Sequence, residues 1–266
     1  MRLRIDLAYD GTDFSGWAKQ PGLVTVQGSL EEALATILRS DDVHTVVAGR
    51  TDAGVHATGQ VVHVDVADET DSAALKQRLN SLLSNSGISV HSVIAAPDGF
   101  DARFSPIFRR YEYRIADTVS ERDPRTRRFT HWVDGPLDVE AMNSAAESLL
   151  GLHDWTTYCK PREGATSVRE LQTFRWARDE HGVLVATIQA DAFCHNMVRN
   201  LVGMCVAVGR GRLVPVDAVT LRDQRHRTSA FVVLPPQGLT LAEVGYPADA
   251  DLAARADQTR DKRDPV

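Results

Sequence analysis

The chain reads Ala48-Gly49-Arg50-Thr51-Asp52-Ala53-Gly54-Val55-His56 between two valine-rich segments. Those segments, residues 43–47 and 59–66, are short, apolar and β-branched, which predicts a strand on each side. The residues between them then form a turn at a sheet edge, and its glycines permit backbone angles that other residues resist. A carboxylate held there beside a guanidinium is a candidate nucleophile or general base. The alternative is structural, because Asp before Ala-Gly is a common turn former.

Patterns around this turn predict an α+β unit. Residues 2–9 alternate apolar with charged side chains, as in a half-buried strand. Ser29 and Glu32 form a capping box that opens one helix, and a second helix begins at Asp71 or Ser72. With a further strand over 88–95, the order is strand, helix, strand, strand, helix, strand, which is typical of a ferredoxin-like unit.

A similar order follows later in the chain, with strands over 109–116 and 239–244 and a helix over 195–208. The sequence therefore predicts an α+β fold of two ferredoxin-like, or RRM-like, halves. Their antiparallel sheets join side by side around a central, positively charged cleft. The N-terminal half, residues 1–98, carries the Asp52 turn, and residues 99–247 form the C-terminal half. Residues 248–266 have mixed charge and few large apolar side chains, which predicts a disordered tail.

The composition indicates a globular protein, with 43% hydrophobic and 25% charged residues among 266. No apolar run approaches the roughly 20 residues that cross a bilayer, and the N-terminus is unlike a signal peptide. The odd number of cysteines, at positions 159, 194 and 205, and the lack of metal-like spacing indicate reduced thiols and no metal site. We therefore expect a cytoplasmic protein with no membrane association.

Positive charge is concentrated in two windows, although the net charge is −6. Residues 100–131 hold eight arginines against five acids, and residues 195–228 hold six against two; neither window contains lysine. Arginine suits bidentate phosphate contacts and stacking on bases. The windows favour a polyanionic partner, with an ordinary solvated surface as the alternative.

Three further residues are candidates for a site. Tyr111 lies on an alternating strand and can present an aromatic face, or simply pack in the core. Arg199 has apolar neighbours in its helix, so we expect a partly buried guanidinium with a carboxylate partner. Leu241 can close a pocket as an apolar wall or be an ordinary core leucine. Other chemistries lack their motifs: there is no G-K-[ST] for a P-loop and no G-x-S-x-G for a serine hydrolase.

Together these segments resemble the TruA family of bacterial tRNA pseudouridine synthases. The A-G-R-T-D-A-G-V-H block is the most specific, and the others are specific as a set. The similar blocks cover most of residues 1–247 in the family's order: 9–17, 48–56, 59–63, 100–105, 109–113, 193–200 and 238–239.

The resemblance implies isomerisation of uridine to pseudouridine at positions 38, 39 and 40 of the tRNA anticodon stem-loop. It implies base flipping, no cofactor, no metal and a homodimer that holds tRNA. Asp52 matches the catalytic aspartate, Tyr111 the tyrosine that packs on the target base, and Arg199 the basic partner of the aspartate. The other substrate-binding matches are Arg50, which helps to displace the uridine, Leu241 or Leu239 as the apolar wall, and Arg103, Arg110 and His195.

Two other functions remain open from the residues alone. One is a non-catalytic RNA-binding protein built from paired ferredoxin-like units, for which an acid in an RNA groove makes little sense. The other is a hydrolase of a glycosidic bond, which usually requires two acids, whereas only Asp52 has a suitable setting. Within the isomerase hypothesis, Asp52 either adds to C1′ or removes the C2′ proton.

Overall fold

The computed structural model describes residues 1–161 and 166–260, which divide into two compact units. Of these residues, the first unit holds 1–107 and 240–260, and the second holds 108–161 and 166–239. The sequence placed the boundary at 98/99 and assigned the last strand to the C-terminal half. In the structure that strand belongs almost entirely to the first unit.

The sheet of the first unit is built around β1 (Arg2–Tyr9), which pairs antiparallel with β4 (Ile88–Ala95) and with β3 (His56–Asp65). β3 also pairs antiparallel with β2 (Thr45–Val47) and parallel with β10 (Leu239–Gly245). The unit is therefore α+β with a mixed sheet, and the prediction of a purely antiparallel sheet is wrong. Parallel pairing needs a long connection, and the chain between β3 and β10 supplies it.

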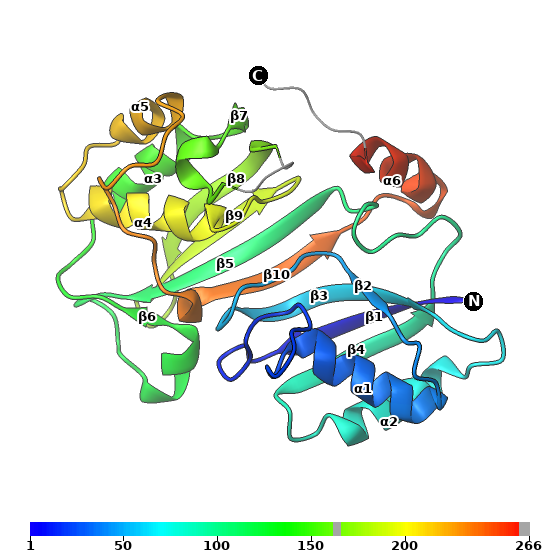
Figure 1. The fold of residues 1–266 in the computed structure, drawn as a ribbon. Coiled ribbons are helices and arrows are strands. Elements are labelled where there is room, and N and C mark those ends of the chain that lie inside the picture. Colours follow the sequence, from blue (N-terminus) through cyan, green and yellow to red (C-terminus); the bar gives the residue numbers. More distant parts are fainter. Residues whose placement is uncertain (162–165, 261–266) are drawn as a thin grey trace. The chain divides into compact units, whose positions relative to one another are not determined.

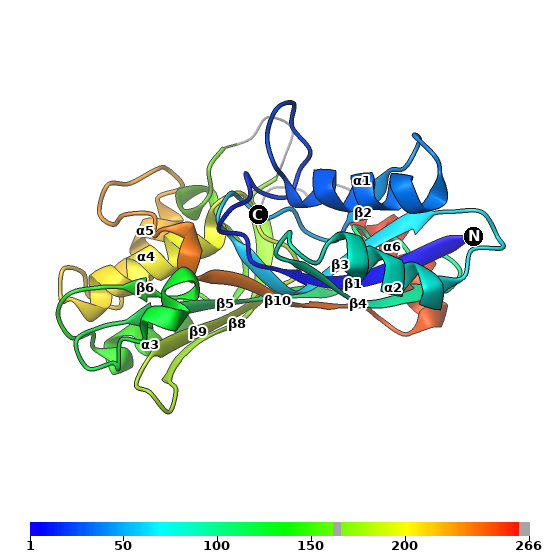
Figure 2. The ribbon, with the colours of Figure 1, turned by 90° about the horizontal axis from the view of Figure 1, so that it is seen from below.

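Two helices of the first unit, α1 (Val26–Leu38) and α2 (Ser72–Leu82), lie side by side (Figures 1 and 2). Asp71 caps α2 by accepting hydrogen bonds from two backbone N–H groups, so the helix begins at Ser72, one of the two starts that the sequence left open. α1 begins earlier than the predicted Ser29, because Thr25 is its N-cap and accepts from the N–H of Gly28 at 3.2 Å. The S-x-x-E pattern therefore lies inside the helix.

The segment predicted to be a disordered tail is folded over residues 249–260. It forms a 3₁₀ turn, η4 (Asp249–Asp251), and the helix α6 (Leu252–Arg260), drawn in red in Figure 1. Leu252 and Ala256 are each only 2% exposed, and Ser105 donates to the Leu252 carbonyl at 3.1 Å. Apolar residues four apart give this polar segment a buried face, which an average over its composition conceals. Residues 261–266 of the predicted tail lie outside the described residues.

The second unit contains an antiparallel run of four strands in the order β5 (Phe108–Ala116), β9 (Leu184–Ala190), β8 (Val168–Arg178) and β7 (Gly151–Asp154). β6 (His131–Trp132) pairs parallel with β5, so this sheet is also mixed. The helix α3 (Val139–Glu147) contacts both β8 and α4 (Met197–Gly209) (Figure 1). The remaining elements are α5 (Asp217–Asp223) and the 3₁₀ turns η1 (Pro124–Phe129), η2 (Thr156–Tyr158) and η3 (Pro236–Gly238).

Burial along α4 singles out one position. Every residue of this helix is buried except Arg199, in its first turn, which is partly exposed. None of the helices in the described part of the chain combines the length and the apolar character that crossing a bilayer requires.

Candidate active site

Asp52 lies in the loop between β2 and β3, where the sequence predicted a turn. The N–H of Val55 donates to the Asp52 carbonyl at 3.1 Å and closes this turn. Gly54 adopts a φ of +76°, a conformation that glycine reaches without strain. Asp52 is partly exposed and Arg50 is exposed, so both charged residues are accessible at the edge of the sheet.

Buried polar side chains fasten this loop to β1 and β3. Gln60 Nε2 donates to the carbonyl of Gly49 at 2.8 Å and to the hydroxyl of Tyr9 at 3.1 Å. The Tyr9 hydroxyl is in turn 2.7 Å from the hydroxyl of Thr51. Burial raises the pKa of Tyr9 to about 12, against the opposing effect of these hydrogen bonds, so the phenol keeps its proton at neutral pH. We call Gln60, Tyr9 and Thr51 the loop brace.

The segment after β1 adds backbone contacts to the same loop. The N–H of Trp17 donates to the Thr51 carbonyl at 3.0 Å, and the N–H of Gly11 donates to His56 Nδ1 at 3.0 Å. The backbones approach so closely that a Cβ on Gly11 would lie 2.0 Å from the Val55 carbonyl oxygen. Only glycine fits there, so residues 9–17 act as a support for the turn that carries Asp52.

The structure separates two other predicted residues of the first unit. Leu241 pairs with Ala57 across β10 and β3, beside the start of the strand that follows the Asp52 loop. Its side chain is fully buried, which is the environment of a core leucine. Arg103 lies elsewhere, because the neighbouring Ala102 N–H binds His63 near the far end of β3. Seven residues of strand separate His63 from His56, or about 23 Å at roughly 3.3 Å per residue.

In the second unit, the ring of Tyr111 packs against the segment that leads to His195. The ring of Tyr111, on β5, meets Phe193 edge-on with centroids 5.1 Å apart and planes at 90°. Phe193 is two residues before His195, which is exposed. Tyr111 itself is 8% exposed. Its neighbour Arg110 donates to Gln189 Oε1 at 3.0 Å.

The guanidinium of Arg199 has backbone and amide partners in the second unit. Its Nε donates to the carbonyl of Leu234 at 2.6 Å, and its Nη1 to the Asn196 side-chain oxygen at 3.3 Å. These bonds orient the guanidinium, and both acceptors are neutral groups. The carboxylate partner expected from the sequence, Asp52, belongs to the other unit, and that pairing stays a prediction.

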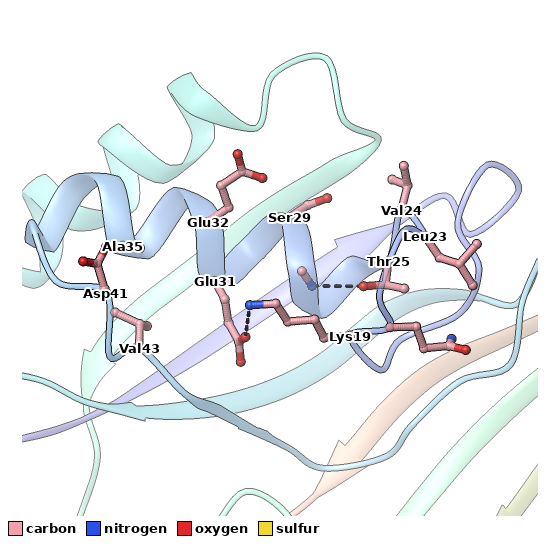
Figure 3. Close-up of a pocket in the computed structure, with 12 residues that line it drawn as sticks. Lys19, Leu23, Val24, Thr25, Ser29, Glu31, Glu32, Ala35, Asp41 and Val43 are labelled. Carbon is pink, nitrogen blue, oxygen red and sulfur yellow. Dashed lines mark hydrogen bonds and ion pairs between the residues drawn. The ribbon is translucent and has the colours of Figure 1, made fainter.

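A pocket of about 440 Å³ beside α1 contains none of the predicted site residues. In Figure 3 Lys19 and Glu31 point toward one another, and their charged atoms are 3.6 Å apart. Glu31 is 4% exposed and accepts from the backbone and the hydroxyl of Thr45, each at 3.0 Å. This carboxylate ties α1 to β2 and is structural. Among the described residues, no three His, Cys, Asp or Glu side chains gather in a group that could hold a metal.

Comparison with known proteins identifies the family. A family model described as tRNA pseudouridine synthase matches residues 7–105 and 145–247. The chain belongs to this family. It is similar to a tRNA pseudouridine synthase A of Leifsonia xyli, with 56% identity over 98% of this chain and 97% of the relative. It is also similar to the enzymes of that name from Streptomyces avermitilis, with 51% identity over 99% and 94%, and Streptomyces griseus, with 50% identity over 99% and 94%.

A solved structure, titled "Crystal Structure of a Cbf5-Nop10-Gar1 Complex", aligns with 77% of this chain and 54% of its own chain. Its TM-score is 0.32 and its sequence identity 9%, so no argument is based on it. The family assignment therefore comes from sequence similarity.

Sequence reasoning missed the loop brace of this pseudouridine synthase family member. Tyr9 is 42 residues from Thr51, and Gln60 is 51 residues from Tyr9, so local patterns do not connect them. The signal that was available is the similarity of residues 9–17 and 59–63 to the family. Those blocks are now explained by their contacts with the Asp52 loop.

The arginine windows are less available to RNA than their composition indicates. Arg109, Arg114 and Arg125 bind, respectively, the carbonyl of Asp191 at 2.8 Å and the carboxylates of Asp179 at 2.6 Å and Asp123 at 2.7 Å. Asp123 is already counted among the five acids of residues 100–131, whereas Asp179 lies outside that window. The pair of Arg114 with Asp179 therefore lowers the local positive charge below the counted excess.

Folding brings two of the three cysteines together, which the sequence did not predict. Cys159 and Cys194 are neighbours, with Cα atoms 5.7 Å apart, and Cys205 is buried elsewhere. The two are 35 residues apart in the sequence, and the N–H of Lys160 donates to the His195 carbonyl at 2.8 Å. An odd cysteine count could not reveal that folding brings η2 beside the segment before α4.

Proposed function

We propose that this chain converts uridine to pseudouridine at positions 38, 39 and 40 of the tRNA anticodon stem-loop. Membership of the tRNA pseudouridine synthase family supports the reaction class. The observation that carries the assignment is the supported turn that holds Asp52 at a sheet edge, with Arg50 two residues before it. A carboxylate in that setting is available for chemistry.

In the proposed reaction, the C1′–N1 bond of the uridine breaks, the base turns, and C1′ bonds to C5. The C5 proton leaves to solvent and N1 takes up a proton, so the product is an isomer of the substrate. Asp52 either adds to C1′ as a nucleophile or removes the C2′ proton as a general base. Neither route needs a cofactor or a metal.

The second unit supplies the proposed contacts with the flipped base. Extraction of a base from a stack costs a few kcal/mol, and stacking on an aromatic ring returns roughly 1–3 kcal/mol. Tyr111 provides that ring, and its edge-on contact with Phe193 fixes its orientation. Arg199 is the basic partner of Asp52 in this proposal, and its bonds to Leu234 and Asn196 orient it.

The remaining roles concern the RNA. Arg50 helps to displace the uridine, and Arg103, Arg110 and His195 bind substrate. Because Arg103 lies near the far end of β3, its contact is with tRNA outside the site of reaction. Leu241 or Leu239 forms the apolar wall.

We further propose two ferredoxin-like halves around a positively charged cleft, a homodimer that holds tRNA, and a cytoplasmic location. The element order of the first unit, strand, helix, strand, strand, helix, strand, supports the first of these. A monomer mass measured by light scattering would contradict the proposed homodimer.

The test is tritium release from tRNA that carries [5-³H]uridine, because the isomers have the same mass. We expect release with the wild-type chain and none with Asp52→Asn, which should still bind tRNA. Nucleotide-resolution mapping should place the product at positions 38–40. Recovery of unmodified tRNA after long incubation would favour a non-catalytic RNA-binding protein, and free uracil would favour a hydrolase.

A further inference from the structure

The loop brace grips the Asp52 loop on both sides of Arg50. At one end of the brace, Gln60 binds the carbonyl of Gly49. At the other end, the hydroxyl of Tyr9 contacts that of Thr51, the residue directly before Asp52. Its three side chains are deeply buried, with exposed fractions of 0% for Gln60, 4% for Tyr9 and 7% for Thr51. The brace is therefore a continuous polar connection inside the core of the first unit.

Chemistry fixes the direction of the two hydrogen bonds that Gln60 donates. A backbone carbonyl only accepts, so the Gln60 nitrogen must face Gly49, and its oxygen accepts from the N–H of Val61 at 3.2 Å. The second N–H of the same amide then donates to the Tyr9 oxygen. The Tyr9 oxygen is in turn 2.7 Å from the Thr51 hydroxyl, and either group can donate in that contact. Hydrogen bonds therefore join the three side chains from the Gly49 carbonyl to Thr51.

Core packing alone does not require these polar groups. Phenylalanine and valine fill nearly the same space as tyrosine and threonine, and replacing both partners of a hydrogen bond by apolar groups is often nearly neutral for stability. A buried polar network instead fixes one geometry, because any shift leaves a desolvated group unpaired. The geometry fixed here is that of the backbone between Gly49 and Asp52.

We propose that Tyr9, Thr51 and Gln60 are positioning residues that hold the backbone of the Asp52 loop in the geometry required for the isomerisation. The inference rests on the proposed function and goes beyond it by assigning three buried residues that do not touch the substrate. A misplacement of about 1 Å in a reacting group costs on the order of 100-fold in rate. Loss of one bond in the brace should therefore lower kcat far more than it changes KM.

The first test compares Thr51→Val with Thr51→Ser in tritium release from [5-³H]uridine tRNA. Valine keeps the shape and removes the hydroxyl, and we expect kcat to fall by about 10- to 100-fold with KM within about threefold. Serine retains the hydroxyl, so it should restore kcat to within about threefold of wild type. This rescue separates the hydrogen bond from a loss of packing.

The second test uses Tyr9→Phe, which removes the central hydroxyl, with Tyr158→Phe as its matched control. Tyr158 is also fully buried, and its hydroxyl donates to the carbonyl of Ala218 at 2.8 Å within the second unit. We expect Tyr9→Phe to lower kcat by about 10-fold and the control to leave it unchanged. The double variant that combines Tyr9→Phe with Thr51→Val should have a kcat no lower than that of Thr51→Val alone. Both substitutions remove the same hydrogen bond between Tyr9 and Thr51.

Amide hydrogen exchange supplies a readout that does not depend on activity. Exchange of the Ala48 and Val55 N–H groups should accelerate by about 10-fold in Tyr9→Phe and not in Tyr158→Phe. The proposal is overturned if Tyr9→Phe and Thr51→Val keep wild-type kcat, or if the control loses as much. If the wild-type chain releases no tritium while these variants still loosen the loop, the proposed function fails and the structural role of the brace stands.

Discussion

Asp52 and Asp117 both lie on turns at the end of a strand, and the two turns are stabilised in opposite ways. The Asp117 carboxylate directly follows β5, has no exposed surface and accepts from Arg178 at 2.8 Å and from the N–H of Leu137 at 3.0 Å. Asp52 is partly exposed, and the groups that support its turn include the hydroxyl of Thr51 and the carbonyl of Gly49.

Asp117 is a structural acid, whereas the proposed function assigns the chemistry to Asp52. Burial acts to raise the pKa of Asp117, but its hydrogen bonds, led by Arg178, lower that pKa to about 2. Asp117 is therefore ionised and committed to holding its own turn. The Asp52 turn is also held by groups other than its own carboxylate, namely the hydroxyl of Tyr9 and the amide of Gln60.

The largest expected effect is on the rate of reaction in Asp52→Asn. Loss of the carboxylate should reduce tritium release by about 10³-fold or more, since it removes the nucleophile or base. The free energy of unfolding, from urea titration, should change by less than about 1 kcal/mol. A variant that turned over normally, or that unfolded, would make Asp52 a structural residue like Asp117.

The next largest effect is a loss of stability on replacing a glycine beside each turn. We compare Gly11→Ala, beside the Asp52 turn, with Gly182→Ala, beside the Asp117 turn. A methyl group on Gly11 meets the Val55 carbonyl at 2.0 Å, so we expect a loss of about 3 kcal/mol or more. Because Val55 lies in the Asp52 turn, tritium release should fall as well. Gly182 has a φ of +75° and its carbonyl binds Arg178. Gly182→Ala should lower the free energy of unfolding by about 1–2 kcal/mol and leave kcat unchanged. Equal losses of kcat in Gly11→Ala and Gly182→Ala would contradict the comparison.

A third prediction concerns the pH dependence of stability in Asp117→Asn. The folded pKa of Asp117 lies near 2 against a usual 3.8, which corresponds to about 2–3 kcal/mol of stability at pH 7. Because the folded pKa is lowered, this contribution is present above pH 4 and is lost as the pH falls toward 2. Urea titrations should show wild type and Asp117→Asn converging over that window. A difference that persisted at pH 2 would exclude the ionised carboxylate as its source.

The smallest effect is expected for Arg125→Ala, which removes the partner of a third turn acid, Asp123. Arg125 lowers the pKa of Asp123 through a hydrogen bond, and the arginine side chain is 88% exposed. Exposed ion pairs contribute little, so the thermal midpoint should not change measurably. A clear drop would show that exposed acids also hold turns in this protein.

Local patterns predicted much of the secondary structure. The alternation in residues 2–9 predicted β1 with its bounds, and Asp71 or Ser72 was predicted as the start of α2. Both signals involve residues that are close in sequence. α6 was missed because its buried face rests on Leu252 and Ala256, two residues in a polar segment.

Contacts between distant residues could not be read from the sequence. The parallel pairing of Leu241 with Ala57 and the link from Tyr9 to Thr51 depend on the folded chain. For the candidate site, the sequence supplied Asp52 and its turn but not the groups that hold them. The one signal in the sequence for the groups that hold the Asp52 turn was the similarity of residues 9–17 and 59–63 to the tRNA pseudouridine synthase family.

The parallel pairing of β10 with β3 also constrains how the protein is made. Translation proceeds from the N-terminus, so β1 and β3 leave the ribosome long before Thr240, and residues 108–239 must be synthesised in between. Until then, the edge of β3 beside His56 and Ala57 lacks its last strand. Unpaired edges are sites of aggregation, so the nascent chain passes through a vulnerable interval that ends only after β10 has been synthesised.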